Sequence, residues 1–222
     1  MLSFWWLFLF CPLAYLLGTV NFSILISRFK GSDVRKSGSG NPGATNMLRA
    51  FGFKWAMATL LLDMLKGGLP TLVGLFAFGG WGYTANPFEP VSNDAGQIGM
   101  YACGLAVAVG HCFPVFMKFR GGKGVATIVG VFTVINPLIG LAGLLFGMLY
   151  WKVFEYVSIS SFSFLTIVTI WEGFVRTTPS YAVASLIISY YLLVLFTHRG
   201  NVYRLLAGKE RRAKNRSKKA VA

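Results

Sequence analysis

The sequence GHCFPVFMKFRGGKGVAT (residues 110–127) decides how the rest of this chain can fold. It separates two apolar segments and concentrates one histidine, three basic residues and four glycines in a short stretch. Gly121, Gly122 and Gly124 allow a tight turn that can bring backbone N–H groups close to a ligand, and Lys123 lies among them. Because an apolar run follows Lys123, we expect these N–H groups to lie at a helix N-terminus, an arrangement that favours phosphate.

A basic loop beside an apolar segment can also do no more than fix the orientation of a chain in a membrane. The Gly-Gly-Lys-Gly core at residues 121–124 favours a phosphate cradle over that simpler role. The loop is not a Walker A sequence, because Met117 stands where the first glycine is required and Gly124 where a serine or threonine is required.

The composition defines the class of protein. Apolar residues make up 55% of the 222 residues, the mean hydropathy is +0.61, and several segments exceed the roughly 18 apolar residues that cross a bilayer. We therefore predict an all-α polytopic membrane protein with a single domain (residues 1–222) and a basic tail from about residue 209. The net charge of +14 does not indicate nucleic-acid binding, because chain orientation and anionic lipid explain basic residues beside membrane spans.

The apolar segments predict about seven transmembrane helices. They lie at about residues 2–27, 55–78, 98–116, 125–135, 137–151, 156–171 and 181–196. The fourth and fifth could instead form one long span, residues 125–150, interrupted near its middle by Asn136-Pro137. Seven crossings place the basic tail on the same side as the other basic segments, whereas six crossings place it on the opposite side.

The distribution of charge predicts the orientation. With seven spans, 19 of the 21 Lys and Arg residues, including those of the C-terminal tail, lie on the same side of the membrane. The positive-inside rule identifies that side as the cytoplasm. We therefore expect the N-terminus outside and the C-terminus in the cytoplasm. The first apolar segment does not read as a cleaved signal peptide, because positive charge follows it instead of preceding it.

A second glycine-rich segment, SGSGNPGATNMLR (residues 37–49), also lies on the basic side. Its glycines match G-x-G-x-x-G, but no strand precedes them, which makes a dinucleotide site a poor interpretation. The segment could be an ordinary solvated loop, or its polar side chains could bind a polyol and a phosphate together. Those side chains are Ser39, Asn41, Thr45, Asn46 and Arg49.

Two charged residues fall inside the second apolar segment. Asp63 and Lys66 are spaced i, i+3, so they can pair on one helical face. Charges within a span are costly and are usually functional or structurally paired. We expect a structural pair, or a pair that faces a polar cavity, in preference to direct chemistry.

The remaining polar positions lie near the ends of the last two segments. Ser158 could offer a hydroxyl to phosphate, although serines in membrane helices more often bond to their own backbone. His198, Asn201 and Arg204 follow one another at i, i+3 spacing and would share one helical face. Neither a carboxylate cluster nor a cysteine pair indicates a metal. A substrate that is already activated would fit such a site, since its reaction needs positioning and charge neutralisation more than a potent nucleophile.

Five segments resemble, in order and spacing, the motifs of the bacterial acyl-phosphate-dependent glycerol-3-phosphate acyltransferases (the PlsY family). They are GSGNPGATNMLR (38–49), LLDMLKG (61–67), GHCFPVFMKFRGGKGVAT (110–127), YVSISS (156–161) and HRGNVYRLLAGKE (198–210). One such segment alone would be weak, but five in order are specific. The resemblance implies an integral membrane enzyme of seven helices with its active site on the cytoplasmic side.

The resemblance also implies the reaction. A fatty acyl group would pass from acyl phosphate to the sn-1 hydroxyl of glycerol 3-phosphate, giving lysophosphatidic acid and phosphate, the first acylation of phospholipid synthesis. The enzyme would be a multi-pass protein of the bacterial plasma (inner) membrane in contact with lipid. We expect a monomer that uses no metal, no other cofactor and no nucleic acid.

The matching motifs name the candidate site residues. Those expected in catalysis are Ser39, Arg49, His111, Lys123 and His198. Those expected to bind substrate are Asn41, Thr45, Asn46, Gly121, Gly122, Gly124, Thr127, Ser158, Asn201 and Arg204. The candidates for phosphate are Arg49, Lys123 and Arg204. The substrate's own phosphate is the candidate general base, with His198 as its rival.

Two alternatives can be weighed against this interpretation. Acyltransferases that use acyl-CoA or acyl-carrier protein carry H-x-x-x-x-D, but Phe116 and Tyr203 stand five residues after His111 and His198, which excludes that class. A transporter of an anionic phosphorylated metabolite is the alternative function, since broken helices and basic loops suit such a protein. A transporter predicts polar motifs on both sides of the membrane, whereas the motifs here share one side.

Overall fold

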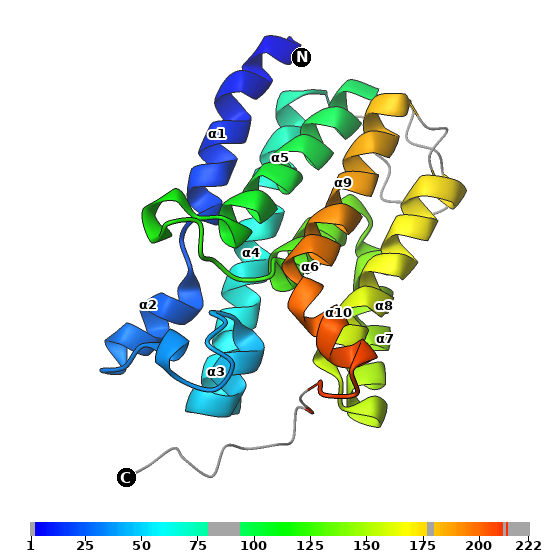
Figure 1. Ribbon diagram of the computed structural model, residues 1–222. Helices are drawn as coiled ribbons and strands as arrows, with labels where there is room; N and C mark the ends of the chain where they lie inside the picture. Colours follow the sequence, from blue (N-terminus) through cyan, green and yellow to red (C-terminus); the bar gives the residue numbers. More distant parts are fainter. Residues whose placement is uncertain (1–2, 80–93, 177–179, 211, 213–222) are drawn as a thin grey trace.

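The structure, a computed structural model, describes residues 3–79, 94–176, 180–210 and 212, and this part of the chain is helical, without a strand (Figure 1). The α-helices are α1 (Leu7–Gly18), α2 (Phe22–Phe29), α3 (Ala44–Phe51), α4 (Phe53–Ala77), α5 (Asp94–Cys112), α6 (Val125–Ile135), α7 (Pro137–Phe154), α8 (Val157–Ile170), α9 (Tyr181–Thr197) and α10 (Arg199–Leu206). Short helical turns are η1 (Phe4–Trp6), η2 (Val34–Lys36), η4 (Val115–Met117) and η5 (Trp171–Arg176).

The centre of the bundle is formed by α4 and α5, which pack against each other. α1 and α9 pack on α5, α6 packs on α4, and α7 pairs with α8 (Figure 1). The backbones of α4 and α6 touch: a Cβ on Gly130 would lie 1.8 Å from the Met64 carbonyl oxygen, and one on Gly67 would lie 2.0 Å from that of Thr127. Close approach through glycine suits helices in a membrane, where burial of apolar surface supplies little driving force.

The first apolar segment, expected as one span, is broken into α1 and α2. α1 ends at Gly18, and the Asn21 side chain caps the N-terminus of α2. The last carbonyl groups of a helix have no partner within the helix. Here the Lys66 ammonium group donates to the carbonyl oxygens of Gly18 and Val20, at 3.4 and 2.7 Å. A neighbouring helix therefore satisfies backbone groups that the break exposes, as a membrane interior requires.

The structure decides between one and two helices at residues 125–151. The chain breaks at Asn136 (φ −149°, ψ 94°), so α6 and α7 are separate helices, as expected from the division into residues 125–135 and 137–151. The Asn136 side chain caps α7 and donates to the buried Glu172 carboxylate at 3.0 Å. Tyr101 donates to the same carboxylate at 2.9 Å. This break, like the first, is held by an ionisable side chain from another part of the bundle.

Four segments of the described chain are long and apolar enough to cross a membrane. They are Phe4–Phe29, Phe53–Ala77, Ala95–Met117 and Pro137–Phe154. The pair α9 and α10, bent by 61°, makes a fifth if it is counted as one span. α6 and α8 are apolar but shorter than the roughly 17 to 25 residues of a typical span. The protein is therefore an all-helical, multi-pass membrane protein, and seven crossings stay a prediction.

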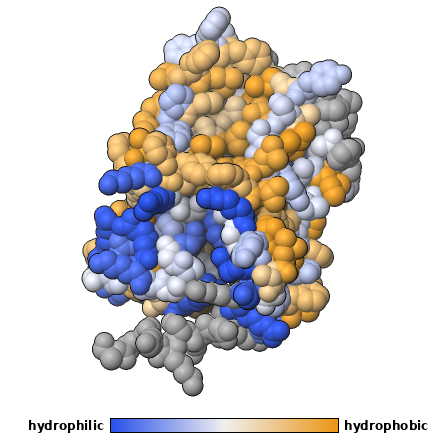
Figure 2. Space-filling model, viewed as in Figure 1, coloured by the Kyte–Doolittle hydropathy of each residue, from blue (hydrophilic) through white to orange (hydrophobic). Residues whose placement is uncertain are grey.

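Polar and apolar side chains are segregated on the surface. Figure 2 shows apolar side chains over α1, α5 and α9, and hydrophilic side chains around a recess bordered by α2, α3 and α10. The polar end of the bundle therefore carries the segments that the sequence placed on the basic side. The described residues do not include residues 80–93, between the second and third expected spans, the Arg176 side chain or the tail beyond Arg212.

Candidate active site

A cavity of about 410 Å³ opens at the polar end of the bundle (Figure 2). Its walls come from α3, α4, α6, α7, α8 and α10, from the end of α5, and from the loops before α3 and α6. Most of the residues expected from the sequence lie on its wall: Ser39, Asn41, Thr45, Asn46, Arg49, His111, Lys123, Gly124, Ser158, His198, Asn201 and Arg204. Segments that are far apart in the sequence therefore meet around one space.

Three basic side chains reach this cavity from different elements. Arg49 extends from α3, Arg204 from α10 and Lys123 from the loop before α6. α6 begins at Val125, directly after Gly124, whose φ of 83° is left-handed, and both residues line the cavity. Since the first N–H groups of a helix lack acceptors within it, α6 adds a partial positive charge to the same wall. The cavity is therefore suited to phosphate.

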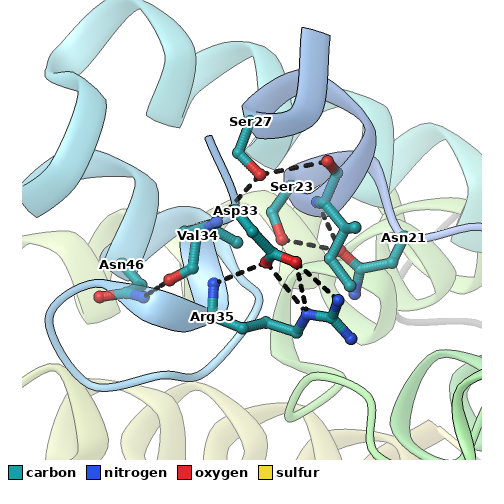
Figure 3. Close-up of polar contacts among 8 residues, drawn as sticks. Asn21, Ser23, Ser27, Asp33, Val34, Arg35 and Asn46 are labelled. Atoms are coloured by element: carbon teal, nitrogen blue, oxygen red, sulfur yellow. Dashed lines mark hydrogen bonds and ion pairs between the residues drawn. The ribbon is translucent and has the colours of Figure 1, made fainter. Parts of the chain in front are cut away.

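Asn46 shapes the glycine-rich loop from within (Figure 3). Its Nδ2 donates to the carbonyl oxygen of Val34 at 2.8 Å, the bond that Figure 3 draws. Nδ2 also donates to the carbonyl oxygen of Ser37 (2.9 Å), and Oδ1 accepts from the Ser39 N–H (3.1 Å). The loop turns closely around this amide, since a Cβ on Gly38 (φ 57°) would lie 2.3 Å from Oδ1. The amide that was expected to bind substrate is thus used to hold Ser39 at the cavity, a role the sequence did not indicate.

Figure 3 also shows how this loop is anchored on α2. The Ser27 hydroxyl accepts from the Val34 N–H and donates to the Ile24 carbonyl oxygen, both at 3.1 Å. Asp33 and Arg35 form an ion pair at 2.6 Å beside it. The glycine-rich loop is therefore attached at one end to α2 and, through Asn46, to α3.

The glycines of the Gly-Gly-Lys-Gly loop differ from the expectation. The N–H groups of Gly121 and Gly122 donate to the carbonyl oxygens of Cys112 and His111, each at 3.1 Å, and neither glycine lines the cavity. A Cβ on Gly122 would lie 2.1 Å from His111 Nε2, so this glycine allows the imidazole to approach. The cradle prediction is corrected accordingly: these two N–H groups face the end of α5, and Gly124 and the start of α6 face the cavity.

Thr127 also lies off the cavity wall. It is buried on the side of α6 that packs against Gly67 of α4. Its hydroxyl has no hydrogen-bond partner among the described residues. This position gives no support to the prediction that Thr127 binds substrate.

A buried ionic cluster lies beside His111. The Lys66 ammonium group is 2.8 Å from Asp63 Oδ1, which confirms the pair predicted from their spacing, and 2.8 Å from His111 Nδ1. Because an ammonium group can only donate, Nδ1 accepts and the imidazole proton lies on Nε2. His111 therefore carries an N–H donor on the side that faces Gly122.

His198 has the opposite tautomer. Its Nδ1 lies 3.0 Å from the Val194 carbonyl oxygen, which can only accept, so Nδ1 carries the proton. The unprotonated Nε2 thus belongs to a side chain on the cavity wall. Of the two histidines at the cavity, His198 is therefore the one that could accept a proton.

Glu210 is a residue of the site that sequence reasoning missed. Its carboxylate accepts hydrogen bonds from Ser158 (3.0 Å), Asn201 and Arg204 (2.8 Å), and its side chain lies on the cavity wall. The Asn201 amide oxygen accepts in turn from Lys123. The available signal was an acidic residue in a strongly basic tail, at the end of the fifth motif. A carboxylate thus lies among the cationic side chains of the wall, in addition to Asp63 elsewhere on the lining.

The pKa of Lys123 reflects these neighbours. Burial lowers it to about 8; the Glu210 carboxylate opposes the shift, and the Arg204 and Arg49 guanidinium groups add to it. Burial alone would raise the pKa of the Glu210 carboxyl group, but hydrogen bonds, chiefly from Asn201 and Arg204, hold it below its usual value. Near neutral pH the wall therefore carries both the ammonium and the carboxylate charge.

The same cavity has an extensive apolar lining. It is formed by Leu48, Phe53, Met57, Leu60, Val129, Leu144, Met148, Trp151 and Phe164. Cations and apolar side chains around one space suit a ligand with an anionic head and a hydrocarbon chain. Among the residues that the structure describes, no group of three or more His, Cys, Asp and Glu side chains could hold a metal ion.

Fold and cavity together define an integral membrane protein with one cavity that is lined by both cationic and apolar side chains. The chain belongs to the glycerol-3-phosphate acyltransferase family, whose sequence model matches residues 8–208. This result confirms the family that the five motifs indicated.

Relatives and solved structures agree with this assignment. The glycerol-3-phosphate acyltransferases of Syntrophotalea carbinolica and Aquifex aeolicus are 38% and 39% identical to this chain over 203 and 205 residues, and the alignments cover 90% of this chain and 94% and 95% of those proteins. The crystal structure of PlsY, an integral membrane glycerol 3-phosphate acyltransferase, in its glycerol 3-phosphate form has a TM-score of 0.77 at 33% identity. The match covers 93% of this chain and 94% of that one, and the lysophosphatidic acid form has a TM-score of 0.76.

Proposed function

We propose that this protein transfers a fatty acyl group from acyl phosphate to the sn-1 hydroxyl of glycerol 3-phosphate, releasing lysophosphatidic acid and phosphate. It acts as a monomer in the bacterial inner membrane, with seven crossings and its cavity open to the cytoplasm. The observation that carries the proposal is the shared cavity, in which Arg49, Lys123 and Arg204 line the same space as the apolar side chains. That combination suits a phosphorylated acceptor and an acyl donor held together.

The reaction requires the protein mainly to position the two substrates and to neutralise their charges. Acyl phosphate is a mixed anhydride, so phosphate is a good leaving group. The acceptor hydroxyl oxygen bonds to the acyl carbonyl carbon, the bond from that carbon to the phosphate oxygen breaks, and phosphate leaves with the electron pair. Arg49 and Lys123 lower the cost of bringing two phosphates together, and N–H donors at the start of α6 and on His111 stabilise negative charge in the transition state.

The proton of the attacking hydroxyl needs an acceptor. We assign the role of proton acceptor to the phosphate of glycerol 3-phosphate, which belongs to the same molecule as the attacking hydroxyl group. His198 is the rival among the side chains, because its Nε2 is unprotonated. His111 does not qualify, since its Nδ1 is engaged by Lys66 and its Nε2 carries the proton.

Substituting the two histidines separately distinguishes these bases. We expect His198→Ala to lower kcat at saturating substrates by less than about 100-fold, because loss of a true general base costs about 10²- to 10⁴-fold. We expect His111→Gln, which keeps an N–H donor, to be more active than His111→Ala. Initial velocities with both substrates saturating provide the measurement. A larger fall in His198→Ala than in His111→Ala, beyond about 100-fold, would assign the base to His198 instead.

The affinity for glycerol 3-phosphate should depend on pH through Lys123. As the pH rises through about 8 its ammonium group loses its proton, and an anion loses a charged donor. A phosphate monoester, with a second pKa of about 6, stays dianionic over the same range. We therefore expect KM for glycerol 3-phosphate to rise above about pH 8 in steady-state assays.

The arginine variant is the control for this pH dependence. Lys123→Arg should keep KM constant to a higher pH, because a guanidinium group remains protonated. A wild-type KM that stays constant between about pH 7 and about pH 9.5 would contradict the prediction.

Release of inorganic phosphate tests the reaction itself. Purified protein in lipid vesicles receives palmitoyl phosphate with or without glycerol 3-phosphate, and a parallel sample receives palmitoyl-CoA as donor. We expect acceptor-dependent phosphate release and lysophosphatidic acid from palmitoyl phosphate alone. Lysophosphatidic acid formed from palmitoyl-CoA but not from palmitoyl phosphate would contradict the proposal that acyl phosphate is the donor. Uptake of glycerol 3-phosphate into vesicles without acylation would indicate a transporter.

A further inference from the structure

Glu210 lies where the chain turns back towards the cavity after α10. Gly208 takes a left-handed conformation (φ 65°), and the Glu210 side chain beyond it is only 8% exposed. Its carboxylate collects donors from two helices, Ser158 on α8 and the pair Asn201 and Arg204 on α10. One side chain thus joins two helices and the start of the tail at the cavity wall.

These bonds use groups that the sequence assigned to substrate. The Ser158 hydroxyl donates its single proton to Glu210. Asn201 uses Nδ2 for Glu210 and Oδ1 for the Lys123 ammonium group. Arg204 uses Nε, which leaves its two terminal nitrogens outside this contact. Ser158 and Asn201 therefore connect parts of the wall, and the two cations are the groups placed to meet an anion.

Glu210 also offsets repulsion among the cations of the cavity. Lys123 faces Arg49 from α3, His198 from the bend before α10, and Arg204 from α10 itself. The Glu210 carboxylate acts on Lys123 with the opposite sign. Without it, like charges would repel one another and the ammonium group would lose its proton more readily.

We propose that Glu210 is a positioning residue: it holds Arg204 directly, and Lys123 through Asn201, in the arrangement that receives the phosphate of the acceptor. It acts through these side chains and does not touch the reacting atoms. This role rests on the proposed function, because it requires that the cavity bind glycerol 3-phosphate. The competing arrangement, in which the Glu210 carboxylate takes the place of phosphate, predicts the opposite effect on affinity.

Binding of glycerol 3-phosphate to the full chain, measured by titration calorimetry without donor at several pH values, provides the test. We expect Glu210→Gln to weaken binding about tenfold. We also expect it to move the alkaline loss of binding to lower pH, because a neutral amide no longer supports the Lys123 charge. Glu210→Asp, which keeps the charge on a shorter side chain, should bind more weakly with the wild-type pH dependence. Glu155→Gln is the matched control, since Glu155 is half-buried next to α8 and off the cavity wall.

Each outcome decides the role of Glu210. Unchanged affinity and pH dependence in Glu210→Gln would overturn it, and tighter binding would overturn it in favour of competition with phosphate. If Glu210→Gln does not fold, Glu210→Asp decides: weaker binding with an unchanged alkaline limit supports the role, and wild-type affinity overturns it. A wild-type protein that does not bind glycerol 3-phosphate would overturn the proposed function as well.

Discussion

Lys123→Met is expected to reduce the rate of acyl transfer by about 10²- to 10³-fold, the loss typical of removing one preorganised donor from a transition state. Lys123 lies on the cavity wall directly before α6, and Asn201 accepts from its ammonium group. Methionine keeps most of the length of the side chain but has no charge to offset two phosphates. We expect both kcat and the affinity for glycerol 3-phosphate to fall, as measured by steady-state phosphate release.

Lys118→Met is the matched control, because Lys118 belongs to the same loop but is exposed and does not line the cavity. Its rate should stay close to that of the wild-type protein. If Lys123→Met also kept a rate within about tenfold of wild type, the cationic cavity would not be the place where the reaction occurs.

Lys66→Met is expected to destabilise the folded protein by about 3 to 5 kcal/mol, the usual cost of removing one partner of a buried ion pair. The change leaves the Asp63 carboxylate buried without its counter-charge and removes the donor to the Gly18 and Val20 carbonyl oxygens. It also frees His111 Nδ1, so its tautomer is no longer determined. The unfolding temperature in detergent should fall, and activity in the folded fraction should fall with it.

A double variant separates charge from shape. Asp63→Asn combined with Lys66→Met should be more stable than Lys66→Met alone, because no unpaired charge remains buried. Lys54→Met is the control on the same helix, since Lys54 is exposed. Equal unfolding temperatures for Lys66→Met and Lys54→Met would show that the cluster does not support the fold.

Local rules explain the parts of the site that could be predicted from the sequence. The Asp63 and Lys66 side chains pair because i, i+3 spacing on a helix brings them together wherever the helix lies. The break at Asn136 follows from the proline after it, which disfavours a continuous helix. Arg49, Lys123 and Arg204 were recognised by charge and by motif, and they do line one cavity.

Contacts that form only when loops and helices fold back on one another explain what could not be predicted. From the sequence, the Asn46 amide was expected to bind substrate. In the structure its Nδ2 and Oδ1 form hydrogen bonds with backbone groups of residues 34–39. Gly122 was expected to offer its N–H group to a ligand. In the structure its missing side chain leaves room for the His111 ring, which packs against it. In the sequence Glu210 is one acidic residue in a basic tail; the turn after α10 brings it to Asn201 and Arg204, and the fold brings Ser158 of α8 to the same carboxylate.

The sequence by itself determined the class of protein, its family and the charged end where the site lies. Composition, apolar length and ordered motifs carry that information, because each depends on residues close together in the chain. The tertiary structure alone decided which polar groups are available to a ligand, since hydrogen-bond partners come from helices brought together by packing. Lys66 shows the difference: its spacing predicts Asp63 as a partner, but only the fold brings the broken end of α1 and the ring of His111 to the same ammonium group.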